Sequence, residues 1–277
     1  VTVTGADDTA IDSTQTSTIT ISIIDAISDN SYDDVTDQTV SATTTDDDVA
    51  GFTIVELDGA TEVDESGSTD TFTVVLDAQP TSNVVISLSS NDGSEISIPS
   101  SLTFTTANWD TPQTVTVTGV DDSIIDGTIT STITVAVDDA NSDDDFDAIA
   151  DQTVSVDTTD DDVAGFTIVE LDGATEVDES GTTDTFTVAL NAQPASDVVI
   201  SLASDDTGEA TVTSTLSFTP ANWDTPQTVT VTGADDTAID STQTSTITIS
   251  IIDAISDNSF DAVADQTVSV DTTDDDV

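Results

Sequence analysis

The stretch Thr114-Val115-Thr116-Val117-Thr118 alternates strictly between an apolar and a polar residue, and every one of its side chains is β-branched. In an extended strand, a period of two places both valines on one face and the threonines on the other. Val and Thr both favour the pleated surface of a sheet. The stretch therefore predicts a β-strand with one buried and one solvent-facing side.

Similar short runs fill the sequence on either side of this stretch, each bounded by turn-forming residues. No window shows the 3.6-residue spacing of apolar positions that marks an amphipathic helix. The runs predicted as strands are 52–57, 60–64, 71–76, 83–88, 95–104, 113–118, 128–137 and 152–156. About seven strands in about 110 residues are typical of an immunoglobulin-like domain. The predicted fold class is all-β, with tandem immunoglobulin-like antiparallel β-sandwiches.

The motif Val-Thr-Val-Thr-Gly begins at Val1, Val115 and Val229, so it recurs with a constant spacing of 114 residues. A period of this length corresponds to a whole domain rather than to one coil of a solenoid. The predicted units are a partial repeat at 1–48, which is the C-terminal half of a domain, a complete middle repeat at 49–162 and a complete last repeat at 163–277.

The partial repeat matches 229–277 more closely than it matches the middle repeat, which suggests that two types of repeat alternate. Half a sandwich has unpaired strand edges and is not expected to be stable alone. Two possibilities follow. Residues N-terminal to Val1 complete the half domain, or another chain completes it by adding strands.

The chain carries 57 acidic residues and no Lys, Arg or His, for a formal net charge of -57. Nucleic acids and anionic membranes are recognised through Lys and Arg, so neither is an expected partner. No apolar run is long enough to span a bilayer. The absence of Cys excludes disulfides, thiolate metal sites and thiol nucleophiles. Cations are the natural partners, and self-repulsion predicts a fold that depends on divalent cations or on high salt.

Three acidic clusters recur: a Glu within Val-Asp-Glu-Ser-Gly, an Asp-Asp pair followed four residues later by another Asp, and an Asp-Asp-Asp triplet. Neighbouring carboxylates repel one another unless a positive charge lies between them. The candidate metal ligands are Asp7, Asp8, Asp12, Asp46, Asp47 and Asp48 in the partial repeat, Glu65, Asp121, Asp122, Asp126, Asp160, Asp161 and Asp162 in the middle repeat, and Glu179, Asp235, Asp236, Asp240, Asp274, Asp275 and Asp276 in the last repeat.

Oxygen ligands without imidazole or thiolate favour Ca²⁺ over transition metals, and a crowded, flexible set of carboxylates favours Ca²⁺ over Mg²⁺. The alternative is that these acids are solvated turns on an acidic surface. That alternative is the stronger one for any single Asp-Asp pair. Three clusters that recur in register across the copies favour a calcium site instead.

In these motifs the chain resembles the Calx-beta domains of sodium-calcium exchangers and of large bacterial surface adhesins. The resemblance covers both complete repeats and the partial one. In the middle repeat it rests on Val-Asp-Glu-Ser-Gly at 63–67, Leu-Thr-Phe at 102–104 with Asn-Trp-Asp-Thr-Pro-Gln-Thr-Val at 108–115, Gly-Val-Asp-Asp at 119–122 with Asp-Gly at 126–127, and Val-Ser-Val at 154–156 leading to Asp-Asp-Asp-Val-Ala-Gly-Phe at 160–166.

The resemblance implies that the early Glu, the loop acids and the terminal triplet hold calcium at the C-terminal pole of each domain, with help from the Ile124 carbonyl. The sequence departs from the family at two places. Ser123 and Thr237 stand where some members have a third loop acid. Glu95 and Glu209 are the only candidates for an acidic ligand from the middle crossover, so fewer or weaker ions per pole are expected.

The predicted function is mechanical: a calcium-rigidified stalk or filament segment of a long repetitive, adhesin-like protein, secreted or at the cell surface and bacterial. The expected partners are calcium ions and neighbouring repeats. The alternatives are a calcium-dependent module that binds glycans or like filaments, and a filament subunit completed by strand exchange. An enzyme is not predicted, because a carboxylate pair for glycoside hydrolysis needs one acid held neutral in an apolar cleft.

Overall fold

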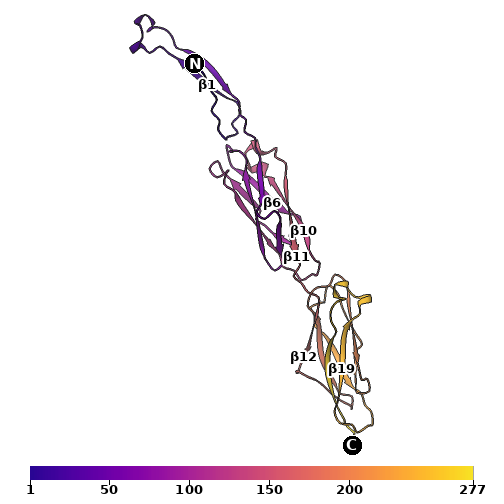
Figure 1. Cartoon of the computed structure of the whole chain (residues 1–277). Coiled ribbons are helices and arrows are strands. Elements are labelled where there is room, and N and C mark those ends of the chain that lie inside the picture. Colours follow the sequence, from indigo (N-terminus) through magenta and orange to yellow (C-terminus); the bar gives the residue numbers. More distant parts are fainter. Residues whose placement is uncertain (277) are drawn as a thin grey trace. The chain divides into compact units, whose positions relative to one another are not determined.

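The computed structural model describes residues 1–276, in which strands dominate (Figure 1). The chain divides into two compact units: Val1–Val120 with Thr130–Thr158, and Asp121–Ile129 with the chain from Thr159 onward. The helical elements are the short 3-10 turns η1 (Asp25–Ile27), η2 (Asn30–Tyr32), η3 (Asp139–Asn141), η4 (Asp144–Phe146), η5 (Asp253–Ile255) and η6 (Asn258–Phe260). Among residues 1–276, no helix has the length and apolar character needed to cross a membrane.

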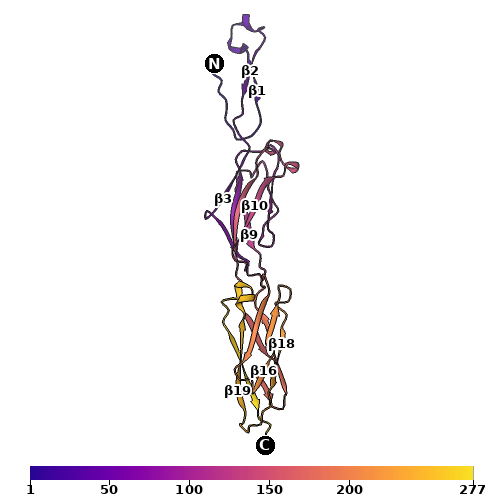
Figure 2. The same ribbon diagram turned by 90° about the vertical axis from the view of Figure 1, so that its right-hand side faces the viewer.

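The middle repeat forms two sheets, with strand orders β3-β5-β9-β7 and β4-β11-β10-β6-β8. Figure 2 labels β3 and β9 of the first sheet and β10 of the second. The strands are β3 (Phe52–Glu56), β4 (Thr61–Asp64), β5 (Thr69–Leu76), β6 (Val84–Ser90), β7 (Ile96–Ser97), β8 (Ser101–Phe104), β9 (Gln113–Gly119), β10 (Ile129–Val137) and β11 (Gln152–Thr159). The predicted all-β class is confirmed.

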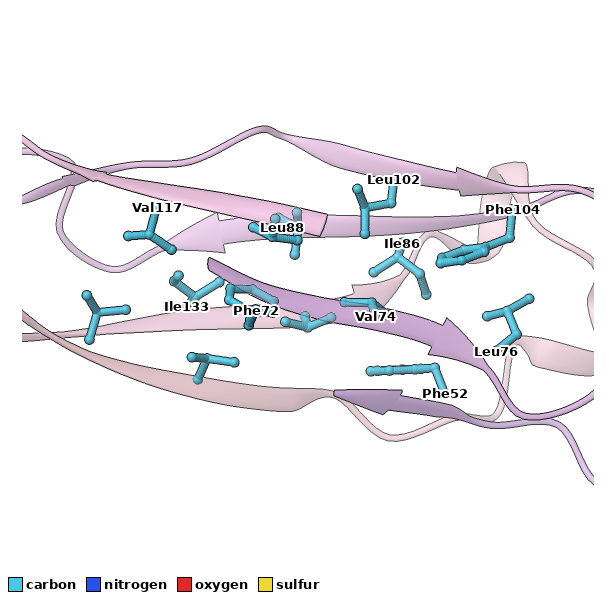
Figure 3. Packing of buried hydrophobic residues seen from close by; sticks show 14 of the residues in the cluster. Phe52, Phe72, Val74, Leu76, Ile86, Leu88, Leu102, Phe104, Val117 and Ile133 are labelled. Atoms are coloured by element: carbon cyan, nitrogen blue, oxygen red, sulfur yellow. The ribbon is translucent and has the colours of Figure 1, made fainter. Parts of the chain in front are cut away.

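The alternation of Val and Thr builds the core of this sandwich. Val115 and Val117 of β9 are buried, whereas Thr114 and Thr116, which alternate with them, are exposed. The buried face of β9 lies against side chains of the opposite sheet, and Figure 3 shows residues of both sheets pointing into the space between them. Trp109, which flanks the strand entry, packs against the same core. The alternating pattern thus places the valine side chains of β9 in the core and the threonine side chains on the outer face.

The predicted strand 95–104 is instead two strands in different sheets. β7 pairs with β9 of the first sheet, and β8 pairs with β6 of the second. Ile96 and Leu102 are both buried, so they face one core from opposite sheets, and the chain has to cross between the sheets to place them. The split turns the eight predicted runs of the middle repeat into nine strands, compared with the approximately seven of an immunoglobulin-like domain.

The last repeat has the same two sheets, with orders β12-β14-β18-β16 and β13-β20-β19-β15-β17. Its strands are β12 (Phe166–Glu170), β13 (Thr175–Asp178), β14 (Thr183–Leu190), β15 (Val198–Ser204), β16 (Ala210–Val212), β17 (Thr215–Phe218), β18 (Gln227–Gly233), β19 (Gln243–Ile251) and β20 (Gln266–Thr273). β13 runs parallel to β20, with Asp178 opposite Thr273. The ends of these two strands therefore lie at the same pole of the sandwich.

The partial repeat forms a hairpin of β1 (Gln15–Ile21) and β2 (Gln38–Thr44), which pair in an antiparallel ladder. Ile19 lies opposite Val40 in this ladder, as Ile247 lies opposite Val268 in the last repeat. The register of the hairpin is therefore that of β19 and β20.

Gly119, the last residue of β9, predicts one large mutational effect. A Cβ at this position would overlap the backbone carbonyl of Asp64, so Gly119→Ala must push β9 away from β4. Overpacking of this kind costs about 1 to 3 kcal/mol. Gly93→Ala is the matched control, since no heavy atom lies within 4 Å of its added Cβ. We expect urea denaturation, monitored by hydrogen exchange of the β9 amides, to show a lower midpoint for Gly119→Ala and an unchanged midpoint for Gly93→Ala. Equal midpoints would rule out this close packing.

Candidate metal centre

Strand topology brings three acidic motifs together in the last repeat. Glu179 directly follows β13, and its N–H donates to the carbonyl of Thr273 at 3.1 Å. The triplet Asp274–Asp276 directly follows Thr273. The start of β19 pairs with the end of β20, Gln243 opposite Thr272, so the preceding loop ends at the same pole. The parallel pairing of β13 with β20 is what places Glu179 beside the triplet.

Five carboxylates converge at this pole in two overlapping groups. Glu179, Asp236 and Asp276 each offer one oxygen, and these oxygens lie within 4.8 Å of one another. Glu209, Asp236 and Asp240 form a second group with the same spacing. Asp236 belongs to both groups. We call these five residues the acidic pole, and its shared member allows two neighbouring cation positions.

Glu179 is the most constrained member of the acidic pole. Its side chain is only 1% exposed, and neither of its carboxylate oxygens has a hydrogen-bond partner. One oxygen of Asp276 and one of Glu209 are also buried without a hydrogen-bond partner. A carboxylate buried in this way is strongly unfavourable unless it is neutralised. Because the chain has no basic side chain, the neutralising charge has to be a bound cation or a proton.

The pKa values of the pole reflect this lack of compensation. Burial, reinforced by Asp236 and Asp274, raises the pKa of Glu179 to about 7. Burial also raises the pKa of Glu209, and nearby Asp240 adds to the effect. The pKa of Asp276 is raised by the same two causes, burial first and neighbouring aspartates second. A bound cation would remove this repulsion.

Asp274 organises the pole through hydrogen bonds to the backbone. Its Oδ1 accepts from the N–H of Asp276 at 2.8 Å, and its Oδ2 accepts from the N–H groups of Asp240 and Ser241 at 3.0 and 3.2 Å. These bonds, the one from Asp276 first, lower the pKa of Asp274. The side chain thus ties the triplet to the loop. The corresponding bonds in the other copies are those of Asp160 with Asp126, Gly127 and Asp162, and of Asp46 with Asp12, Ser13 and Asp48.

The remaining predicted ligands of the last repeat face solvent. Asp275 is exposed between two half-buried neighbours, because successive residues of the extended triplet point to opposite sides. Asp235 is exposed beside the half-buried Asp236. Neither belongs to the two groups of converging oxygens.

The predicted ligands of the middle repeat divide between the two units. Glu65 is buried in the first unit. In the second unit, Asp162 has a buried carboxylate oxygen without a hydrogen-bond partner. Burial, with Asp160 and Asp161 adding to it, raises the pKa of Asp162. Asp122 accepts a hydrogen bond from the N–H of Ile124 at 2.6 Å. Of the other four members, Asp160 is half-buried, and Asp121, Asp126 and Asp161 are exposed.

The partial repeat has the aspartates of a pole without its glutamates. A cavity of about 360 Å³ is lined by all six predicted ligands, Asp7, Asp8, Asp12, Asp46, Asp47 and Asp48. Burial, followed by repulsion from its two neighbours in the triplet, raises the pKa of Asp48. Residues 1–48 contain no Glu, so nothing within them corresponds to Glu179 or Glu209.

Glu209 is the residue whose place in the site the motifs did not determine. It is 8% exposed, lies directly before β16 where the chain crosses between sheets, and contributes to the second group of oxygens. Its carbonyl accepts from the N–H of Ala234, which fixes the start of the acidic loop. The sequence indicates this residue only through its position: Glu95 and Glu209 stand at the same place in the two complete repeats, directly before β7 and β16.

The acidic loop 121–129 also makes contacts within the second unit. The carbonyl of Ser123 accepts from the N–H of Gln193 at 2.6 Å, and Ile124 forms a parallel bridge with Gln193. Ile125 packs against the core of the last repeat. In the first unit, the N–H of Gln79 donates to the carbonyl of Thr9 at 2.7 Å in the same way. One loop therefore holds predicted ligands, including Asp122 and Asp126, and these contacts with the last repeat.

The raised pKa of Glu179 predicts how the stability of the metal-free protein depends on pH. Its folded value is about 7 and its ordinary value is 4.5, so between these values the folded state binds more protons than the unfolded state. The contribution of Glu179 is then fully present below pH 4.5 and is lost as the pH rises through 7. We expect urea midpoints in chelator to fall over this window, and to fall less in Glu179→Gln. A midpoint difference between the two proteins that does not change with pH would refute this.

No protein-family model and no curated protein matches the chain. Among solved structures, the chain is similar to the crystal structure of calcium binding domain CBD12 of CALX1.1, with 14% identity over 72% of this chain and 79% of that chain and a TM-score of 0.29. It is also similar to the apo-form Calx CBD1 domain, with 15% identity over 42% of this chain and 100% of that chain and a TM-score of 0.31. A third similar structure is that of domains 4 and 5 of the S-layer protein SbsC, with 19% identity over 68% of this chain and 76% of that chain and a TM-score of 0.32. The matches thus include Calx domains, which the motifs resemble, and S-layer domains.

Proposed function

We propose that each acidic pole binds calcium and that the chain is a calcium-stiffened stalk or filament segment of a long extracellular protein. The observation that carries this proposal is Glu179. Its carboxylate is buried, both oxygens lack a hydrogen-bond partner, and it faces other carboxylates in a chain without basic residues. Such an arrangement needs a cation or a proton to neutralise it, and above a pH of about 7, where Glu179 loses its proton, a bound cation has to supply the charge.

Calcium fits the ligands of the acidic pole better than other metals. Ca²⁺ accepts 6–8 oxygen ligands in flexible geometry, whereas Mg²⁺ requires a near-ideal octahedron and keeps several waters. The pole offers no imidazole or thiolate, which disfavours transition metals. Two Ca²⁺ ions that share Asp236 would nearly balance the five carboxylates. Water and backbone carbonyls complete their coordination.

The mechanical role follows from the loop that carries the ligands. Asp122 and Asp126 belong to loop 121–129, which also contacts Gln193 and inserts Ile125 into the packing of the next repeat. A cation that fixes these aspartates therefore fixes the docked loop as well. Without a cation, repelling carboxylates loosen it. An extracellular module needs an affinity on the order of only 0.1 to 1 mM for this purpose.

Small-angle X-ray scattering in calcium and in chelator tests this role. We expect the scattering of the wild-type chain to indicate a narrower range of conformations in calcium. Ile125→Ser should still bind calcium, because it keeps every carboxylate, but should lose the stiffening. Ile239→Ser is the matched control, since Ile239 occupies the same place in the last repeat and is 72% exposed. A wild-type profile that calcium leaves unchanged would argue against the stalk.

A further inference from the structure

The partial repeat has the same sequence as a segment that forms part of the core in the last repeat, but several of its apolar side chains are exposed. Residues 1–31 are identical to residues 229–259. In the last repeat, Val231 and Ile249 are 0% exposed, whereas the identical residues Val3 and Ile21 are each 55% exposed. The difference in burial cannot come from the sequence of this segment. It comes from what covers the segment in the last repeat.

Residues 163–228 provide that cover in the last repeat. β14 and β16 both pair with β18, β15 pairs with β19 and β13 pairs with β20, so four ladders join the first half of the repeat to the second. Phe186 and Ile200 of the covering half are fully buried in the shared core. In the partial repeat, β1 pairs with β2 alone, and residues 1–5, which correspond to the end of β18, belong to no strand.

We propose that the partial repeat is an acceptor face for a half-repeat of the type of residues 163–228, which adds strands along β1 and along residues 1–5. The occupant is a polypeptide with the alternating apolar pattern of β14 and β15. Calcium binding is not a premise of this inference. It rests on identical residues that are buried in one place and exposed in another.

The identity of the segment selects the type of half-repeat. Residues 1–31 are identical to residues 229–259, which pair with 163–228 in the last repeat. The middle repeat has the smaller Val135 in its core, where the partial and last repeats have Ile21 and Ile249. Because cores are close-packed, the occupant of the partial repeat resembles 163–228 rather than 49–114.

A complete repeat of a second copy is not the occupant. Residues 163–228 of that copy are already paired with their own second half. Transferring them to the partial repeat would expose as much apolar surface as it covers, so the exchange has no hydrophobic driving force. The occupant is a half-repeat that has no second half of its own.

The test joins an additional copy of residues 163–228 to the full chain, directly before Val1, and measures amide hydrogen exchange. We expect exchange in β1 and β2 to slow by about 100-fold or more, toward the rates of β19 and β20, because a cooperative core replaces an isolated hairpin. β19 and β20 are the internal reference, in calcium and in chelator alike. If they stay protected while β1 and β2 exchange as fast as in the unfused chain, the proposal is wrong.

A second fusion tests the selection by size. In the middle repeat, residues 49–114 pack in one core with Val135, and the partial repeat has the larger Ile21 at that place, so we expect about tenfold less protection of β1 from overpacking. Ile21→Val should recover protection in the 49–114 fusion only. Equal protection by the two fusions would refute the selection. The unfused chain should sediment as a monomer, and a tight dimer that protects β1 would identify a second copy as the occupant and overturn the proposal.

Discussion

Glu179→Gln is expected to stabilise the metal-free protein and to remove the calcium-dependent stabilisation of the last repeat. The two effects have opposite signs and one cause. Glu179 is buried among carboxylates, and its pKa is raised to about 7, so at neutral pH without a cation it opposes folding. An amide of the same shape removes that charge. It also removes one ligand of the group formed with Asp236 and Asp276.

Calorimetric titration and urea denaturation at pH 8 measure both effects. We expect calcium affinity at the last repeat to fall by at least about tenfold, because affinity follows the number of charged ligands. In chelator, the urea midpoint of Glu179→Gln should exceed that of the wild type. Glu176→Gln is the matched control: Glu176 is an exposed residue of β13, so the charge change is equal and neither quantity should move. A destabilised metal-free Glu179→Gln would contradict charge burial as the common cause.

Calcium itself should raise the thermal stability of the complete repeats substantially. A ligand that binds only the folded state stabilises it by RT ln(1 + [L]/Kd), and extracellular modules have Kd values on the order of 0.1 to 1 mM. At 10 mM calcium each occupied position then contributes about 1.4 to 2.7 kcal/mol. The two overlapping groups of the last repeat offer two such positions.

Differential scanning calorimetry separates this binding from general screening. With a net charge of -57, any salt weakens self-repulsion, so the reference sample contains NaCl at the same ionic strength. We expect a rise in Tm with CaCl₂ well beyond that with NaCl, and a smaller rise with MgCl₂. Equal shifts in the three salts would mean that screening alone acts on the chain.

Most of the fold follows from local alternation. The period of two in stretches such as β9 predicts the strands, and burial of Val115 and Val117 confirms which face turns inward. The crossing between β7 and β8 did not follow, because 95–104 is continuous in its β-forming residues. The crossing depends on Ile96 and Leu102 facing one core from two sheets, which is a property of the assembled sandwich.

The motifs point to the stretches whose carboxylates converge in the last repeat, but they do not determine the geometry of the candidate site. A run such as Asp274–Asp276 shows three acids, and only the path of the chain decides that Asp276 turns inward while Asp275 faces solvent. Glu209 joins the site because the crossing strand carries it to the pole. The parallel pairing of β13 with β20, which brings Glu179 to the triplet, is a non-local contact that no sequence pattern encodes.

Anomalous X-ray scattering from crystals of the chain grown in calcium tests the central claim most directly. We expect an anomalous peak between Glu179, Asp236 and Asp276, with carboxylate oxygens at about 2.3 to 2.6 Å from it. If calcium is saturating and no peak appears while Glu179 stays buried beside Asp236 and Asp276, a proton neutralises Glu179 instead. Calcium would then not be what holds this acidic chain in its fold.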